Sequence, residues 1–397
     1  MDRGEFRALL EEHFVPMLAG TALGRTRPSQ SNHQLVAYGN PCTILMKPVR
    51  TAEYRVELVR SQPFTSDEKR LVLLFVEELE QVVIHSDAPY FRDLVTSIPR
   101  RVISSLLPGT RGRTTLESAI QKFEELASQT YEGRPVVAAL GMTGSIGHGP
   151  IRLADLWRED FSRVLSNGFD SMYLCGSDGK VFNLACLPEP PSVEFSPHRL
   201  GSVAAWCHKQ RRVAIVLNRN GEVLIFKDQK LQFAKRRGAW RYYAHDSVVG
   251  RLGVGNKRLR RAVYESCLDV SFSRTGGCVA ILSQKKAKRV QKLLAERDLI
   301  TGLHQTRTKL LSCAVTKPFH RLDRRLRQQI LSMDGATVLS HKGKVMTAGS
   351  IVRVPGGSTG GGRKAAALQL SKLGLAIKIS ADGPITGFRN REAIFVL

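Results

Sequence analysis

The sequence predicts a mixed α/β protein whose C-terminal domain has a mixed sheet with helices packed on it, preceded by a β-rich module and a mostly helical N-terminal region. Apolar residues recur at helical spacing early in the 397-residue chain and at strand spacing in its middle. Toward the C-terminus, segments with helical spacing of apolar residues alternate with segments that have strand spacing. Because 42% of the residues are hydrophobic, several cores are possible, and we expect three domains at residues 1–134, 135–256 and 257–397.

The N-terminal helices are predicted from apolar spacing and from capping signals. A helix over Asp67–Ile84 is opened by Thr65 with Glu68 three positions later, which is a capping-box pattern. A further helix is expected after Thr114, with Glu117 at the same relative position. The segments typical of strands in this region are Leu35–Lys47 and Tyr54–Val59.

A glycine-rich loop, Gly141–Gly149, lies between a predicted strand at Pro135–Leu140 and a predicted helix at about Ile151–Leu165. Phosphate-binding loops have this order, but the Gly-Lys-Ser/Thr ending that they need is missing. Two interpretations remain: a nucleotide site, or a flexible connection between domains.

Two hairpins are predicted in the β-rich module. Ser171–Cys175 and Val181–Leu187 flank a glycine-containing turn. Val213–Leu217 is expected to pair with Val223–Phe226 across a turn ending in Asn-Gly, which favours the positive backbone angles of tight turns.

Three aromatic residues, Trp240, Tyr242 and Tyr243, follow a basic run in the same module. Aromatic side chains at such spacing often complete a sheet core. With cationic neighbours they could instead form a stacking platform for nucleic acid.

The C-terminal domain is predicted to alternate helices with strands. Helices are expected at Lys257–Phe272, Lys288–Glu296, His320–Leu331 and Lys364–Leu373, and strands at Cys278–Leu282, Thr337–Leu339, Val345–Thr347 and Leu375–Ile379.

The chain is strongly basic, with a formal net charge of +25, which favours an acidic partner such as a nucleotide, nucleic acid or an anionic membrane surface. Its seven cysteines form no CxxC pair, which argues against a disulfide framework and a structural zinc site, so we expect a cytoplasmic protein. No apolar run approaches the roughly 20 residues that a membrane span needs, so we expect none.

The strongest chemical signal lies between Leu331 and Phe388. This stretch contains, in order, Asp334-Gly335-Ala336, the run Gly356–Ala367 with the sequence GGSTGGGRKAAA, and Ser380-Ala381-Asp382. Glycines let backbone N–H groups approach a ligand, and Arg363 and Lys364 add positive charge where a helix begins, so the run predicts a phosphate site. Asp334 and Asp382 could hold a metal ion that the phosphates share.

These motifs resemble those of the diadenylate cyclase family. That family has Asp-Gly-Ala, then Gly-x-Arg-His-Arg-Ala-Ala, then Ser-Glu-Glu after an apolar strand, and this chain is similar to it from about Arg261 to Leu397. The lead-in Ala262–Phe272, followed by Arg-Thr-Gly-Gly, is also similar to the way such domains open.

The chain departs from the family at two motifs. The family's Arg-His-Arg is Arg363-Lys364-Ala365 here, and Ser-Glu-Glu is Ser380-Ala381-Asp382. A lysine still presents a point charge, but an alanine cannot replace a guanidinium group that grips two phosphate oxygens. One carboxylate is also absent, and the other is a methylene shorter.

The resemblance implies a nucleotidyl cyclase that condenses two ATP molecules into cyclic di-AMP, or a related cyclic dinucleotide, and releases pyrophosphate. It further implies control by N-terminal sensor modules, Mg²⁺ or Mn²⁺ as cofactor, and a face-to-face dimer or higher oligomer that brings two sites together. The implied catalytic residues are Asp334, Gly335, Arg363 and Lys364, the implied nucleotide-binding residues are Thr275, Gly276, Gly277, Ala336, Gly361, Gly362 and Ser380, and the implied metal ligands are Asp334 and Asp382.

Two alternatives belong to other functional classes. A cyclase-like fold could bind nucleotide without turnover, because Ala365 and Ala381 stand where the family has charged residues. A nucleic-acid-binding protein is suggested by the net charge of +25 and by the basic and aromatic segment Lys235–Tyr243.

Overall fold

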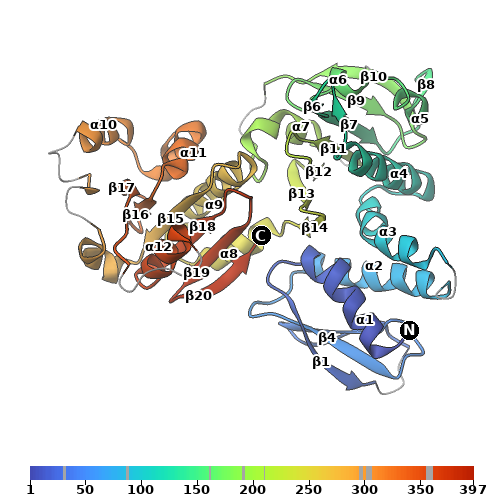
Figure 1. Cartoon of the computed structure of the whole chain (residues 1–397), viewed down its shortest axis with the longest axis horizontal. Coiled ribbons are helices and arrows are strands. Elements are labelled where there is room, and N and C mark those ends of the chain that lie inside the picture. Colours follow the sequence, from blue (N-terminus) through green and yellow to red (C-terminus); the bar gives the residue numbers. More distant parts are fainter. Residues whose placement is uncertain are drawn as a thin grey trace. The chain divides into compact units, whose positions relative to one another are not determined.

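The computed structural model describes residues 1–29, 33–85, 89–160, 162–189, 193–209, 211–294, 298–300, 306–354 and 361–397. It divides into two compact units, Met1–Ala244 and His245–Leu397. Both units combine helices with sheets, so the predicted mixed α/β class is confirmed (Figure 1).

The N-terminal unit contains two main sheets and several helices. Its helices are α1 (Arg3–Leu9), η1 (Leu10–Phe14), η2 (Val15–Met17), α2 (Ser66–Val83), α3 (Phe91–Ser104), α4 (Thr110–Leu126), α5 (Leu153–Leu156), α6 (Ser162–Leu165), η3 (His198–Leu200) and α7 (Gly201–Trp206). Its strands are β1 (Ala22–Pro28), β2 (Val36–Asn40), β3 (Thr43–Met46), β4 (Tyr54–Val59), β5 (Thr130–Tyr131), β6 (Arg134–Pro135), β7 (Ala138–Thr143), β8 (Ile151–Arg152), β9 (Ser171–Cys175), β10 (Lys180–Cys186), β11 (Arg212–Leu217), β12 (Val223–Lys227), β13 (Lys230–Arg236) and β14 (Ala239–Tyr242).

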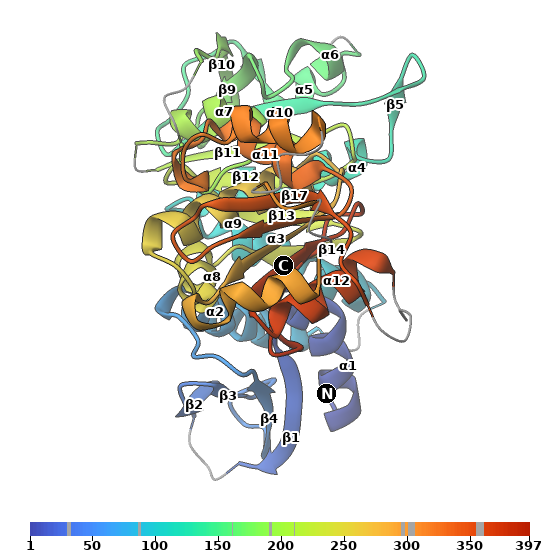
Figure 2. The same ribbon diagram turned by 90° about the vertical axis from the view of Figure 1, so that its left-hand side faces the viewer.

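The first sheet has the strand order β1-β4-β3-β2, and α1 lies beside it (Figure 2). Helix α1 begins with a capping box in which Asp2 accepts a hydrogen bond from the Glu5 backbone and Glu5 accepts one from the Asp2 backbone. Phe6 then packs edge-on against Tyr54 of β4, with 6.2 Å between ring centroids. The predicted strand Leu35–Lys47 is therefore two strands, β2 and β3, joined by a turn at residues 41 and 42.

The predicted capping box of α2 is confirmed. Thr65 accepts a hydrogen bond from the Glu68 backbone, and Glu68 accepts one from the Thr65 backbone. Glu68 also forms a buried pair with Arg60, whose Nη1 and Nη2 donate to its two carboxylate oxygens at 2.7 and 2.6 Å. Burial alone would raise the pKa of Glu68, but the hydrogen bonds and charge of Arg60 outweigh burial and hold that pKa below 4.5.

We expect Glu68→Gln to destabilise the chain by about 3–5 kcal/mol near neutral pH, because Arg60 would remain buried without its anion. A depressed folded-state pKa stabilises the fold above the unfolded value near 4.5, and this contribution is lost as pH falls through the folded pKa. In thermal unfolding, the melting temperature of the wild type should therefore exceed that of the variant, and this difference should become smaller below pH 4.5. Glu11→Gln, at an exposed site, serves as the control. A difference in melting temperature that stays constant with pH would contradict the lowered pKa of Glu68.

The predicted start of the next helix after Thr114 is wrong. Helix α4 begins at Thr110, and its N-cap is Gly109, which has a φ of +79° and no capping side chain. The hydroxyl of Thr114 donates to the Thr110 carbonyl, so it is used inside the helix.

The second sheet has the order β14-β13-β12-β11-β7-β9-β10-β8. Both predicted hairpins are confirmed, since β9 pairs with β10 and β11 with β12 in antiparallel register. Trp240, Tyr242 and Tyr243 are 5%, 9% and 2% exposed, so they belong to the core and cannot form an exposed stacking platform for nucleic acid. Trp240 Nε1 donates to Glu124 Oε1 of α4 at 2.9 Å.

The glycine-rich loop joins β7 and β8 of this one sheet, so the prediction of a connection between domains is wrong. A Cβ added at Gly149 would lie 1.7 Å from the Val181 carbonyl oxygen, and one at Gly147 would lie 2.6 Å from the Lys180 carbonyl oxygen. The glycines let the loop backbone lie directly on β10. This close packing accounts for them without a bound phosphate.

The predicted helix at Ile151–Leu165 is also wrong. Ile151 and Arg152 form β8 on the edge of the sheet, where Ile151 pairs with Val181. Among the residues described here, two single-turn helices follow, α5 and α6. The apolar spacing of this segment reflects a strand and two short turns, which helical periodicity cannot separate from one helix.

The C-terminal unit is built on a six-stranded sheet with the order β17-β16-β15-β18-β19-β20. Its strands are β15 (Gly277–Leu282), β16 (Ala336–Leu339), β17 (Val345–Ser350), β18 (Gly374–Ile379), β19 (Ile385–Arg389) and β20 (Glu392–Val396). Its described helices are α8 (His245–Leu252), α9 (Lys257–Phe272), η4 (Gln284–Lys292), α10 (Thr306–Ala314), η6 (Phe319–Arg321), α11 (Arg324–Ser332) and α12 (Gly362–Ser371). The sheet is mixed as predicted, because β15 runs parallel to β16 and antiparallel to β18.

Helices cover both faces of this sheet. Helix α12 packs on the face that carries Cys278, Ala280 and Leu282. The alternate residues of β15 point to the opposite face, where α9 and α11 pack together and against the strands. Arg324 of α11 donates Nε and Nη2 to the buried Asp269 carboxylate of α9 at 2.8 and 2.9 Å. This bidentate pair fixes the two helices together.

The predicted helix α9 has the expected bounds, but two other helices of this unit differ from expectation. The segment predicted as a helix at Lys288–Glu296 forms the 3₁₀ turns η4 over Gln284–Lys292, and residues 295–297 lie outside the described residues. The segment His320–Leu331 is divided into η6 and α11, because Asp323 caps a new helix with hydrogen bonds from two backbone N–H groups. Among the described helices, none combines the length and apolar composition that crossing a bilayer needs.

Candidate functional site

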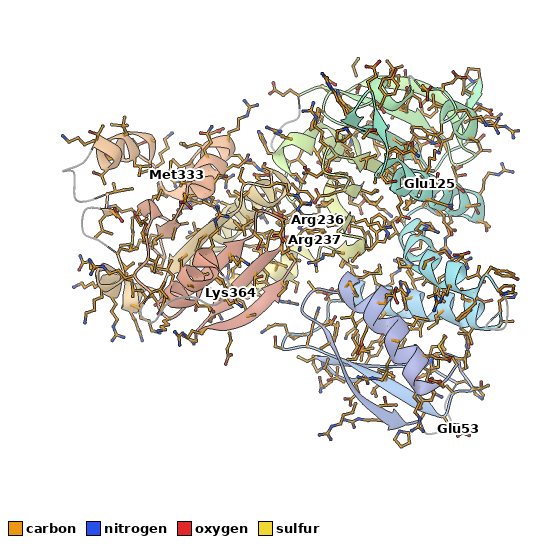
Figure 3. All side chains as sticks on the ribbon, in the orientation of Figure 1. Glu53, Glu125, Arg236, Arg237, Met333 and Lys364 are labelled. Atoms are coloured by element: carbon orange, nitrogen blue, oxygen red, sulfur yellow. The ribbon has the colours of Figure 1, made fainter. Side chains whose placement is uncertain are left out.

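A cavity of about 730 Å³ opens in the C-terminal unit beside the start of α12. The described residues that line it are Cys278, Asp334, Gly335, Ser350, Ile351, Val352, Val354, Gly361, Gly362, Arg363, Lys364, Ala365, Ala366, Lys378, Ser380 and Ala381. Figure 3 labels Met333, which directly precedes Asp334, and Lys364 at the start of α12. The volume lies within the range of small-molecule sites.

Tight backbone packing places the Asp334 loop at this cavity. Gly335 has a φ of +98°, and a Cβ there would lie 2.5 Å from the Gly349 carbonyl carbon and 2.7 Å from the Ser350 carbonyl oxygen. Only glycine allows the entry to β16 to lie this close to the end of β17. Gly335 therefore holds the Asp334 backbone against the wall that Ser350 and Ile351 continue.

Three cations and one carboxylate line the cavity without ion-pair partners among the described residues. Arg363 and Lys364 occupy the first turn of α12, which contains no acidic residue and has no capping side chain. Lys378 comes from the buried strand β18. Cations at a helix N-terminus oppose the helix dipole, and a bound anion would remove that conflict.

The Arg363 guanidinium is held against β15. A Cβ added at Gly276 would lie 2.5 Å from Arg363 Nη1, so glycine leaves the space that this side chain occupies. The Arg363 Nε is buried and has no hydrogen-bond partner in the described part of the chain. Burial raises the pKa of the Cys278 thiol to about 12, and the neighbouring Arg363 charge only partly opposes this rise. Cys278 is therefore a neutral thiol near pH 7 and not a nucleophile.

Asp334 is exposed, and its Oδ1 accepts a hydrogen bond from the Gly335 backbone at 3.1 Å. The second carboxylate oxygen of Asp334 is therefore available to a molecule bound in the cavity. The carboxylate can hold a hydroxyl group or a divalent cation.

Asp382 lies outside the described lining of the cavity. It is exposed in the turn after β18, where Ser380 N donates to the Pro384 carbonyl and the Arg274 guanidinium donates to the Asp382 carbonyl. The described residues contain no group of three or more His, Cys, Asp or Glu side chains that could hold a metal ion. A divalent ion at Asp334 would need phosphate and water oxygens for its other ligands, which is usual for Mg²⁺.

Of the remaining predicted residues, some line the cavity and others lie outside its described lining. Thr275 Oγ1 is 2.9 Å from Ser332 Oγ, and a Cβ at Gly277 would lie 2.3 Å from the Leu331 carbonyl oxygen, so both residues face α11. Ala336 is buried in β16. Ser380, Gly361 and Gly362 line the cavity. Residues 356–360 of the glycine-dense run lie outside the described residues.

Sequence reasoning did not single out several lining residues. Lys378 interrupts the buried run of β18, and a charged residue among apolar strand positions was the available signal. Ile351 is 79% exposed at the cavity, and with Val352 and Val354 it supplies an apolar wall. The cavity thus has an apolar side, a cationic side and one carboxylate, which is a composition suited to a nucleotide.

No protein-family model and no curated protein matches this sequence. Among solved structures, a double mutant of DacA from Staphylococcus aureus is similar at 14% sequence identity and a TM-score of 0.25. The match covers 35% of this chain and 86% of that chain. A likeness at this level decides no function, so the function is inferred from the cavity and its residues.

Proposed function

We propose that the C-terminal unit is a nucleotidyltransferase that binds ATP in this cavity and joins two ATP molecules into cyclic di-AMP. The observation that carries the proposal is that Asp334, Arg363 and Lys364, from separate segments, line one cavity with no protein counter-ions among the described residues. The motif resemblance to diadenylate cyclases supports the choice of reaction. The apolar wall at Ile351 offers a surface for a base.

In the proposed reaction, the 3′-oxygen of one ATP attacks the α-phosphorus of the other. A new P–O bond forms, the bond to the β-phosphate oxygen breaks, and pyrophosphate leaves with its electron pair. The hydroxyl proton passes to solvent or to Asp334. Repetition in the reverse direction closes the ring, so two cavities must face each other in a two-fold assembly.

The residues of the cavity divide these tasks. Arg363, Lys364 and the backbone of Gly361 and Gly362 would neutralise charge that grows on the phosphates. Asp334 would hold the attacking hydroxyl and, with phosphate oxygens, Mg²⁺ or Mn²⁺. A bound divalent ion supplies further charge neutralisation at the phosphates.

A second candidate function is nucleotide binding without turnover. Ala365 and Ala381 both line the cavity, at positions where the resembling family has an arginine and a glutamate. Two of the charges expected around the phosphates and the metal are therefore missing.

Incubation of the full chain with ATP and either Mg²⁺ or Mn²⁺, followed by chromatography, separates these functions. Cyclic di-AMP and pyrophosphate in a 1:2 ratio are expected for the cyclase. Saturable ATP binding with no product under either metal would favour the binding function. Absence of ATP binding would overturn both.

Arg363→Ala is expected to weaken ATP binding about tenfold or more. A hydrogen bond to a charged group typically contributes more binding free energy than a tenfold change in affinity requires. Calorimetric titration with ATP provides the measurement. Arg321→Ala removes an exposed arginine from η6, outside the cavity lining, and should bind ATP like wild type. Equal affinity in the Arg363 variant would remove this residue from the site.

Ala365→Arg restores the family's second arginine at a position that lines the cavity and is 8% exposed. We expect the rate of product formation to rise about tenfold or more, because one positioned hydrogen-bond donor to a charge that develops in the transition state typically raises the rate by at least this factor. Ala393→Arg makes the same chemical change at an exposed position of β20 and should have no effect. If neither variant changes a measurable rate, the missing guanidinium does not limit turnover.

A further inference from the structure

A second cationic hollow lies within the N-terminal unit, where α3 ends and α4 begins. It has a volume of about 570 Å³, and its described lining contains the cations Arg70, Arg113, Arg211 and Lys227 and one carboxylate, Asp228. These cations come from α2, α4, the entry to β11 and the end of β12. The folding of the unit therefore gathers like charges from four separate segments around one space.

The arginines of this hollow have few structural roles in the described part of the chain: the Arg113 charge partly opposes the rise that burial causes in the pKa of Glu78, and the Arg211 side chain lies over Gly144. Arg70, Arg113 and Arg211 are exposed, and none forms an ion pair with a described residue. Arg211 also has a φ of +68°, a backbone conformation that is costly for a residue with a side chain. Like charges brought together in this way raise the free energy of the empty hollow and favour an anion in it.

Lys227 points into the same region and is fixed there. Its Nζ donates to the Leu106 carbonyl at 2.6 Å, which leaves its two other N–H donors for a ligand. Burial lowers the pKa of Lys227, and the nearby Arg70 lowers it further, while Asp228 raises it. The Lys227 ammonium is thus half-buried beside another cation.

The start of α4 completes the cationic side. Its N-cap Gly109 lines the hollow, and this 17-residue helix has no capping side chain and no acidic residue in its first turn. The first backbone N–H groups of α4 therefore adjoin the four cations.

A smaller hollow of about 200 Å³ adjoins the first, and Arg70, Lys227 and Asp228 line both. The side chains that line only the smaller hollow are the apolar or aromatic Leu71, Leu74, Phe233 and Tyr242 and the polar Asp67 and Gln232. Together the two spaces offer a cationic part for phosphates and a part with both apolar and hydrogen-bonding side chains for the rest of a ligand.

We propose that this double hollow, the α3–α4 cleft, binds a small molecule that carries a diphosphate and an aromatic group such as a nucleobase. The cleft belongs to the N-terminal unit and is independent of the cavity at Asp334.

Calorimetric titration of the full chain with inorganic pyrophosphate and with ADP tests this proposal. Both titrations use the Arg363→Ala background, so that the cavity of the C-terminal unit contributes little. The cleft variant Arg113→Gln/Arg211→Gln is compared with Arg92→Gln/Arg134→Gln, which removes two exposed arginines of the same unit that do not line the cleft.

We expect the affinity of the cleft variant for pyrophosphate and for ADP to be about tenfold or more lower than that of the Arg363→Ala parent. The affinity of the control variant should stay within about twofold of the parent's. ADP should bind several-fold more tightly than pyrophosphate, through the smaller hollow. Equal weakening in the cleft and control variants would show non-specific attraction and overturn the site. Equal affinities for pyrophosphate and ADP would overturn the aromatic part of the proposal.

Discussion

Asp334→Asn is expected to lower formation of cyclic di-AMP by about 10²-fold or more, which is the usual loss when a positioned acid–base group is removed. Asparagine keeps the size of the side chain, so the hydrogen bond from the Gly335 backbone can remain. The charge that would hold the hydroxyl and a divalent ion is lost. Because Asp334 is exposed and forms no ion pair with a described residue, the fold should be unaffected.

The measurement is the initial rate of product formation with Mg²⁺ or Mn²⁺, together with ATP affinity and the thermal midpoint. Asp382→Asn makes the identical chemical change outside the described lining of the cavity and should retain most of the activity. An active Asp334 variant would end its catalytic assignment. An equal loss in both variants would place Asp382 in the site as a second carboxylate.

Gly149→Ala is expected to destabilise the N-terminal unit by about 3 kcal/mol or more, at the upper end of the range for overpacking. The new Cβ would lie 1.7 Å from the Val181 carbonyl oxygen and 2.3 Å from its carbonyl carbon. Both atoms belong to backbone that cannot rotate away. The edge strand β8 would have to separate from β10 to accept even one methyl group.

Chemical denaturation of the full chain provides the measurement for this variant. Gly39→Ala is the matched control in the same unit, because a Cβ there meets nothing nearer than 3.7 Å. The control should unfold like wild type. If Gly149→Ala also did so, the loop would be free of β10 in solution, and its glycines would again require a functional explanation.

Local chemistry made much of the fold predictable. The capping box at Thr65, the two hairpins of the large sheet and the bounds of α9 depend on residues close together in sequence, and each was found from spacing alone. Errors occurred where a long-range contact decides the local structure. Ile151 forms a strand because Val181 lies beside it. The start of α4 is an error of another kind, because the helix begins locally, after Gly109, which adopts a positive φ and carries no capping side chain.

Some residues of the candidate site were also found from the sequence, and others were placed there only by the structure. The motif order directed attention to Asp334, Arg363 and Lys364, and these three side chains do line one cavity. Lys378, Ile351 and the neutral thiol of Cys278 could not be assigned to that cavity from their own segments. Their membership depends on how the start of β15 and the ends of β17 and β18 come together around the start of α12.

The sequence by itself determined helix α9, the capped start of α2 and the two hairpins, and it showed which residue types could attract phosphate. It did so because caps, glycine turns and apolar periods act over a few residues. Only the tertiary structure decided that four cations of the N-terminal unit surround one hollow and that Gly276 leaves space for the Arg363 guanidinium. These arrangements arise when sheet pairing and helix packing bring distant segments together, and no local pattern contains that information.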